Sequence, residues 1–128
     1  MALTHTTATR NELADLIRNL VDAGTTDTTG DLIIMAGDDS SVASLSWTAT
    51  PSFDSASGGN ITMSAINDDT SAPGGTAAAF KFQNRDNTEV FRGTVTVTSG
   101  GGDIELSSIN IGPGDTVSIT SFQYSSSA

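Results

Sequence analysis

The sequence predicts a mainly β protein, a β-sandwich or jelly-roll-like fold with one N-terminal amphipathic α-helix. Three observations lead to this expectation. Short segments of alternating apolar and polar residues recur through 31–124, and a two-residue period is typical of strands with one face in a core. Turn residues such as Gly, Asp, Asn and Pro separate these segments. Residues 1–24 have instead the apolar spacing of a helix.

The chain of 128 residues has the size of a single domain, in which we distinguish an N-terminal arm and helix at 1–24 from a β-sandwich at 31–124. Ser and Thr contribute 36 residues, whereas aromatic residues make up only 5%. Bulky core material is therefore scarce. Because buried apolar area stabilises by about 25 cal/mol per Å² whichever chain supplies the cover, such a domain can gain stability from an additional interface.

The helix is expected between Thr9 and Gly24. Thr9 and Glu12 have the three-residue spacing of a capping box, and Gly24 is a stop signal. The apolar residues between them fall on one helical face: Leu13, Leu16, Ile17, Leu20 and Val21. This stripe needs cover, and two interpretations stay open. It covers one side of the chain's own β core, or it also packs on a neighbouring subunit.

The first β segments differ in how much of each strand is buried. The apolar run at 32–35 predicts a strand covered on both faces. Residues 43–49 alternate, and Trp47 is in phase with Leu45 and Ala49, which places its side chain in the core. A further alternating segment is expected at 61–65, and turns or loops at 38–41, 51–60 and 67–75.

The clearest hairpin is expected at 78–97, with its turn at 84–88. Val90 is out of phase in the returning strand, which indicates a β-bulge or contact with another surface, and the bulge is the commoner cause. Glycines at 100–102 break this strand. Later strands are expected at 104–106, 109–111, 117–119 and 122–124, with a Gly-Pro-Gly-Asp turn at 112–115.

Charge and composition exclude several classes of partner. The chain has 15 acidic and 5 basic residues, a formal charge of −10, which repels nucleic acid and anionic lipid. It has no cysteine, so it forms neither a disulfide nor a thiolate metal site. No apolar run reaches membrane-spanning length, and acidic residues interrupt the region where a secretion signal would lie. We expect a protein that is made and used without export.

No catalytic motif is recognisable, so we expect no enzyme, cofactor or metal ligand. The only histidine, His5, precedes the helix in a Thr-rich segment and is expected to be solvated. The paired acids at 38–39 and 67–69 could offer oxygen ligands to calcium, although neighbouring Asp residues are ordinary turn formers. Three basic residues surround the hairpin and could pair with carboxylates of another subunit, or simply protect a solvated edge: Lys81, Arg85 and Arg92.

Several segments resemble the small virion structural proteins of tailed bacteriophages. They are residues 1–4, 9–13, 21–24 and 30–34 near the start, and 109–112 and 115–122 near the end. The resemblance implies a capsid decoration or cement protein, a type that in several phages sits at local three-fold positions of the shell. It implies no catalytic residue.

We therefore expect a capsid decoration protein that binds the major capsid protein on the outer shell, bridges its subunits as a homotrimer and stabilises the mature head. It would be made in the host cytoplasm and located on the capsid surface of the virion. The expected interface residues are Leu13, Ile17, Leu20 and Val90. Two alternatives stay open: a tail, collar or fibre-associated virion protein, and a carbohydrate-binding module or small hydrolase that exposes Trp47 or Tyr124 as a sugar platform.

Overall fold

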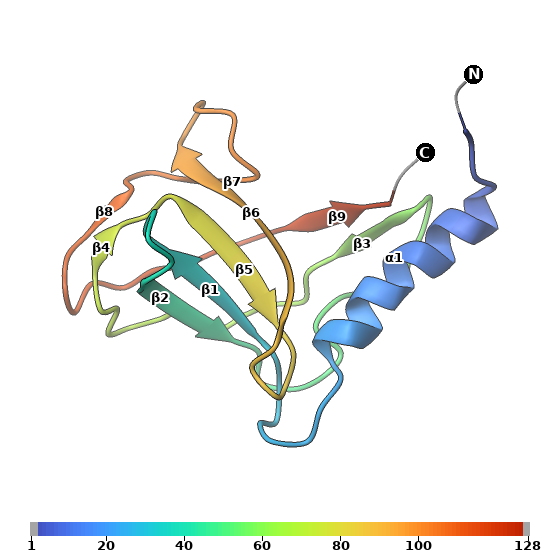
Figure 1. Ribbon diagram of the computed structural model, residues 1–128, viewed down its shortest axis with the longest axis horizontal. Coiled ribbons are helices and arrows are strands. Elements are labelled where there is room, and N and C mark those ends of the chain that lie inside the picture. The colour runs from blue at the N-terminus through green and yellow to red at the C-terminus, as the bar shows by residue number, and fades with distance from the viewer. Residues whose placement is uncertain (1–2, 127–128) are drawn as a thin grey trace.

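The computed structural model describes residues 3–126, so the first two residues of the predicted arm lie outside the described part. The fold is mainly β with one helix at the N-terminal end, as predicted (Figure 1). Its elements are α1 (Thr7–Val21), β1 (Asp31–Met35), β2 (Ser41–Ser46), β3 (Asn60–Thr62), β4 (Gly75–Thr76), β5 (Ala79–Gln83), β6 (Glu89–Val97), β7 (Ile104–Leu106), β8 (Asn110–Ile111) and β9 (Gln123–Ser125).

Five strands form one sheet in the order β2-β1-β5-β6-β7, and this sheet curls into a half-barrel consistent with a β-sandwich-like fold. Two short antiparallel ribbons, β3–β9 and β4–β8, complete the β structure. Helix α1 lies at one side of the molecule, where it contacts β3 and β6 (Figure 1). The arrangement leaves much of the helix surface away from the sheet.

Strand β1 confirms the prediction of a strand covered on both faces. It lies between β2 and β5, and Leu32 and Ile34 are opposite Phe82 and Phe80 in the core. Ile33 points to the other face of the sheet and is also buried. A strand in the interior of a curled sheet has neighbours on both edges and on both faces, which explains its continuous apolar run.

The hairpin of β5 and β6 is also confirmed, and so is the bulge. Phe82 is opposite Phe91, whereas the next residue, Gln83, is opposite Glu89. Val90 is therefore the extra residue in β6. Its side chain is half-buried and packs against the core of its own chain.

The direction of β7 is a feature that alternation does not predict. It runs parallel to β6, with Val95 opposite Ile104. The glycine loop between them folds tightly onto Thr96, since the Gly102 N–H donates to Thr96 Oγ1 at 3.0 Å. A Cβ on Gly102 would lie 2.9 Å from this side chain, so only glycine permits the close return.

Two of the expected strands are shorter or absent. The alternating segment predicted at 61–65 is a strand only as far as Thr62, the end of β3. Ala65, whose side chain was expected in the core, is exposed. Val117 and Ile119 are buried, as their alternation predicts, but they belong to no named strand, and Val117 forms an isolated bridge with Asp69. Buried and exposed residues therefore alternate at 117–120, although this segment pairs with another only through that single bridge.

The core is built around aromatic rings, with Phe82 at its centre. Its ring lies 4.7 Å from that of Phe91, 5.1 Å from that of Phe122 and 5.9 Å from that of Trp47. Trp47 is only 3% exposed, which confirms its predicted place in the core. The few aromatic residues of this chain are thus concentrated in one cluster.

The predicted N-cap of the helix, Thr9, is wrong by three residues. Helix α1 begins at Thr7, and its N-cap is Thr6, whose Oγ1 accepts the Thr9 N–H at 3.2 Å. Thr9 therefore lies in the first turn and cannot head a capping box with Glu12. Several consecutive threonines offer equivalent caps, and sequence spacing alone does not choose among them. At the other end, α1 ends at Val21 with Asp22 as its C-cap, three residues before the predicted stop, and Gly24, with a φ of +120°, lies in the connection that follows.

Candidate functional site

Helix α1 is held to the β body by its polar face. The Asn11 Oδ1 accepts the Gly59 N–H at 2.7 Å, and the Asp15 Oδ1 accepts the Ala56 N–H at 2.9 Å. One turn before the helix terminus, Arg18 donates to Ser55 Oγ at 3.1 Å. All three partners belong to the same loop, between β2 and β3.

A fourth bond continues this row, because Asp22 accepts the Ser52 N–H at 3.0 Å. Asn11, Asp15 and Asp22 are separated by four and seven residues, which places them on one helical face. We call Asn11, Asp15, Arg18 and Asp22 the polar anchor. It satisfies backbone N–H groups of a loop that has few strand partners, and it fixes the rotation of the helix about its own axis.

The predicted apolar stripe is consequently divided between two environments. Val21 is buried, together with Ala14, and Ile17 packs partly against the core. The three leucines are exposed instead: Leu13 by 39%, Leu16 by 52% and Leu20 by 42%. We call Leu13, Leu16 and Leu20 the leucine face. Of the two interpretations of the stripe, cover of the chain's own core accounts for only part of it.

The leucine face is apolar along its whole length. Thr9, four residues before Leu13 in the helix, extends it at its N-terminal end and is exposed. No charged residue interrupts this row, although the chain carries a net charge of −10. It is a continuous uncharged strip on a strongly acidic molecule.

The four expected interface residues do not lie together on one exposed surface. Leu13 and Leu20 belong to the leucine face, whereas Ile17 and Val90 are half-buried against the core. Leu16, which was not among them, is the most exposed of the three leucines. The polar anchor was missed as well, and its signal was the spacing of Asn11, Asp15 and Asp22.

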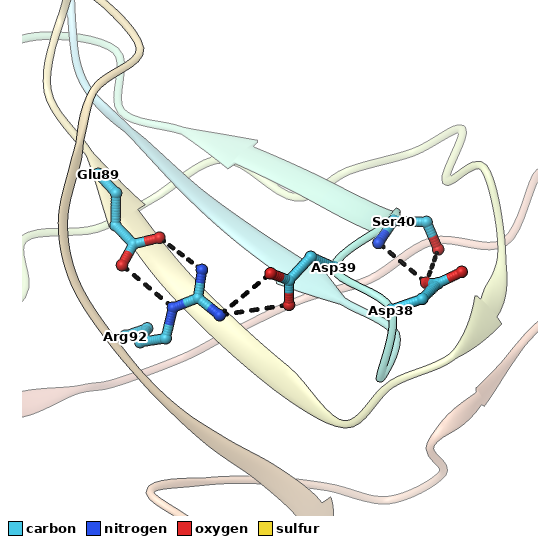
Figure 2. A network of polar contacts seen from close by, with 5 residues as sticks. All are labelled: Asp38, Asp39, Ser40, Glu89 and Arg92. Carbon is cyan, nitrogen blue, oxygen red and sulfur yellow. Dashed lines mark hydrogen bonds and ion pairs between the residues drawn. The ribbon is translucent and has the colours of Figure 1, made fainter.

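The basic residues of the hairpin are engaged within the chain. Figure 2 shows Arg92 between Glu89 and Asp39, with N–O distances of 2.7 and 3.2 Å. These contacts raise the pKa of Arg92 above its ordinary value, and the guanidinium lowers the pKa of Glu89. Arg85 donates to the Asp27 carbonyl at 2.7 Å, and Lys81 lies half-buried on β5.

The paired acids serve as turn and edge groups. Asp38 accepts from the N–H and the hydroxyl of Ser40 (Figure 2), which lowers its pKa. Asp69 accepts the Ser44 N–H at 2.8 Å. Among residues 3–126, no group of three or more His, Cys, Asp or Glu side chains is placed to hold a metal ion.

The remaining expected site residues are in different settings. His5 lies in the arm that precedes α1. Trp47 is buried, so it offers no sugar platform, whereas Tyr124 is half-buried with its ring 5.5 Å from that of Phe91.

Comparisons with protein-family models, with curated proteins and with solved structures found no match to this chain. In the described part of the chain, no helix is long and apolar enough to cross a membrane. The leucine face groups three of the exposed large apolar residues on one helix of an acidic molecule, and we take it as the candidate functional site.

Proposed function

We propose that this protein is a structural component of a larger assembly, a virion decoration protein that associates with copies of itself through the leucine face. The observation that carries the proposal is that helix α1 packs on its own chain through Ala14, Val21 and the polar anchor, yet leaves three leucines exposed. A helix that needed only to cover its own core would not require an apolar row on its outer side.

The chemistry of the face favours a second copy of the chain as its first partner. Two copies with a charge of −10 each repel each other, and a contact through the uncharged leucine face adds no local repulsion between carboxylates to this cost. Contiguous apolar strips are also typical of interfaces between subunits. The resemblance to small phage virion proteins supports the proposal that the resulting oligomer sits on the capsid.

The test is the mass of the full-length protein measured by light scattering after size exclusion. We expect an oligomer, a trimer under the decoration hypothesis, and dissociation to monomers when Leu13, Leu16 and Leu20 are changed together to Gln. Gln preserves helix propensity and removes only the apolar contact. Val97→Gln is the matched control, because Val97 is 44% exposed and lies at the end of β6 that pairs with β7. A triple variant that keeps the native mass would overturn the proposal.

The location in the particle needs a separate measurement. Antibody labelling of virions in negative-stain microscopy should give signal over the whole shell if the protein decorates the capsid. Signal confined to one vertex or to the tail would assign it to the tail or collar instead.

A further inference from the structure

A groove lies where the half-barrel is left open, between β6 and β9. Its cavity has a volume of about 280 Å³ and is lined by both strands and by Asp103. The floor consists of aromatic rings in mutual contact: Phe91 with Tyr124, and Phe80 with Phe122, each pair at 5.5 Å between ring centroids. The groove is therefore apolar at its base.

The β6 side of the groove is an open strand edge. The Val95 N–H donates to the Ala78 carbonyl, so alternate residues of β6 direct their backbone groups away from β5. Thr94 is one of these, and its N–H is taken by the Asp103 carboxylate. Arg92 is the next, and it has no strand neighbour on that side, because the β6–β7 ladder begins only at Val95.

The β9 side is open in the same way. The Phe122 carbonyl accepts from Met63, and the Ser126 N–H donates to Gly59, so the bonds to β3 use the even-numbered residues of this strand. Gln123 and Ser125 direct their backbone groups to the opposite side, and both line the groove with Arg92. Two strand edges thus direct backbone N–H and C=O groups toward one cavity, which has aromatic rings at its floor and polar side chains around it.

We propose that this groove binds an extended segment of a second copy of the chain, its N-terminal arm, as an added β-strand. The inference rests on the proposed function in that it requires copies of the chain to meet. Backbone pairing would supply the affinity, and an apolar side chain on the aromatic floor would supply the register. The bulge at Val90 and the Asp103 cap limit the open edge of β6 to a window centred on Arg92.

The arm fits this site by shape and by charge. Its described residues before Thr7 have no regular structure, and Leu3 is 85% exposed. Thr is a favourable strand residue, and the segment before Glu12 contains no carboxylate. The carboxylate of Asp103 lines the groove, and the cation in the lining, Arg92, is already paired with Glu89 and Asp39, so the surroundings would repel acidic segments of this chain.

The test is a titration of the ¹⁵N-labelled full-length protein with a synthetic peptide of residues 1–8. We expect chemical-shift changes centred on the amides of Arg92, Gln123 and Ser125, and a peptide with Leu3→Ser should produce at least about tenfold weaker binding, the loss expected for one buried Leu contact. A second variant, Gln123→Pro, removes one edge donor and should also weaken binding. Absence of shifts with the native peptide would overturn the proposal.

One further outcome would also decide against the proposal. Shifts at the same amides produced by a cello-oligosaccharide, but not by the peptide, would overturn the proposal and assign the groove to a glycan. Because the peptide is added in trans, its binding does not depend on the leucine face, so the two proposals can fail separately. If Gln123→Pro does not fold, the Leu3→Ser peptide still decides the question.

Discussion

The carboxylate of Asp103 accepts the backbone N–H of Thr94 at 3.0 Å, on the edge of β6 that faces away from β5 and just before the pairing with β7 begins at Val95. The opposite edge of the same sheet, β2, has an equivalent contact, in which Asp69 accepts the Ser44 N–H at 2.8 Å. A carboxylate at a strand edge satisfies a free donor and brings a charge, and both effects discourage pairing with another chain. On β6, the Asp103 cap leaves the segment around Arg92 as the part of this edge that faces the groove.

Removal of the Asp103 cap should make the protein more prone to associate through β6. We expect Asp103→Ala to aggregate faster than the native protein in a concentration series followed by light scattering, because the Thr94 N–H is then free for pairing. Asp103→Asn is the control, since its amide oxygen can still accept this bond. Equal aggregation rates for Asp103→Ala and the native protein would show that the carboxylate does not protect the edge.

Gly93 should tolerate no side chain. A Cβ at this position would lie 2.6 Å from the Phe80 ring and 2.7 Å from Asp103 Oδ2. We expect Gly93→Ala to lower the free energy of unfolding by about 1–3 kcal/mol, as is usual for an overpacked site. Urea denaturation measures this loss. Gly101→Asn is a matched control in a loop, because Gly101 has a positive φ and open space around it.

The sequence predicted those parts of the fold that depend on local pattern. Each of three features follows from the apolar and polar pattern within its own segment: the buried strand β1, the hairpin of β5 and β6, and the bulge at Val90. The parallel direction of β7 was not predictable in this way. It depends on the tight contact of Gly102 with Thr96, which alternation in the flanking strands does not encode.

The candidate site was predicted only in part, for a related reason. Apolar periodicity shows that a helix has an apolar face but not which of its neighbours covers that face. Here Asn11, Asp15 and Asp22 determine the rotation of α1, because their bonds to the loop before β3 leave the leucine face outward. Hydrogen bonds between segments about 40 residues apart are not visible in the helix sequence itself.

Trp47 should report on the core and not on a ligand. Its ring is 3% exposed and its Nε1–H donates to the Ser64 carbonyl at 3.2 Å. We expect blue-shifted fluorescence that iodide quenches weakly and that soluble glycans leave unchanged. Trp47→Ala should cost about 3–5 kcal/mol, since it removes a ring from the aromatic cluster. Strong quenching of the native protein would contradict the burial described for this residue.

Asp31 should make stability depend on pH. Burial, and secondarily the Asp27 carboxylate, raises the pKa of Asp31. The folded state therefore binds this proton more tightly than the unfolded state, so the ionised group opposes folding at pH 7. Asp31→Asn should raise the melting temperature at pH 7, and the difference should disappear below about pH 3.5, where both states are protonated. Asp68→Asn, which removes an exposed charge, is the control and should change the melting temperature less.

Salt should strengthen self-association through the leucine face. Each copy has a charge of −10, so bringing two copies together costs repulsion that depends on ionic strength, while the contact itself contains no charge. Raising the salt concentration from about 0.02 M to about 0.5 M shortens the screening length from roughly 20 Å to below 5 Å and should lower the dissociation constant measured by sedimentation equilibrium. An interface built from ion pairs would respond in the opposite direction. Dissociation at high salt would therefore place the contact on charged residues and exclude the leucine face as its centre.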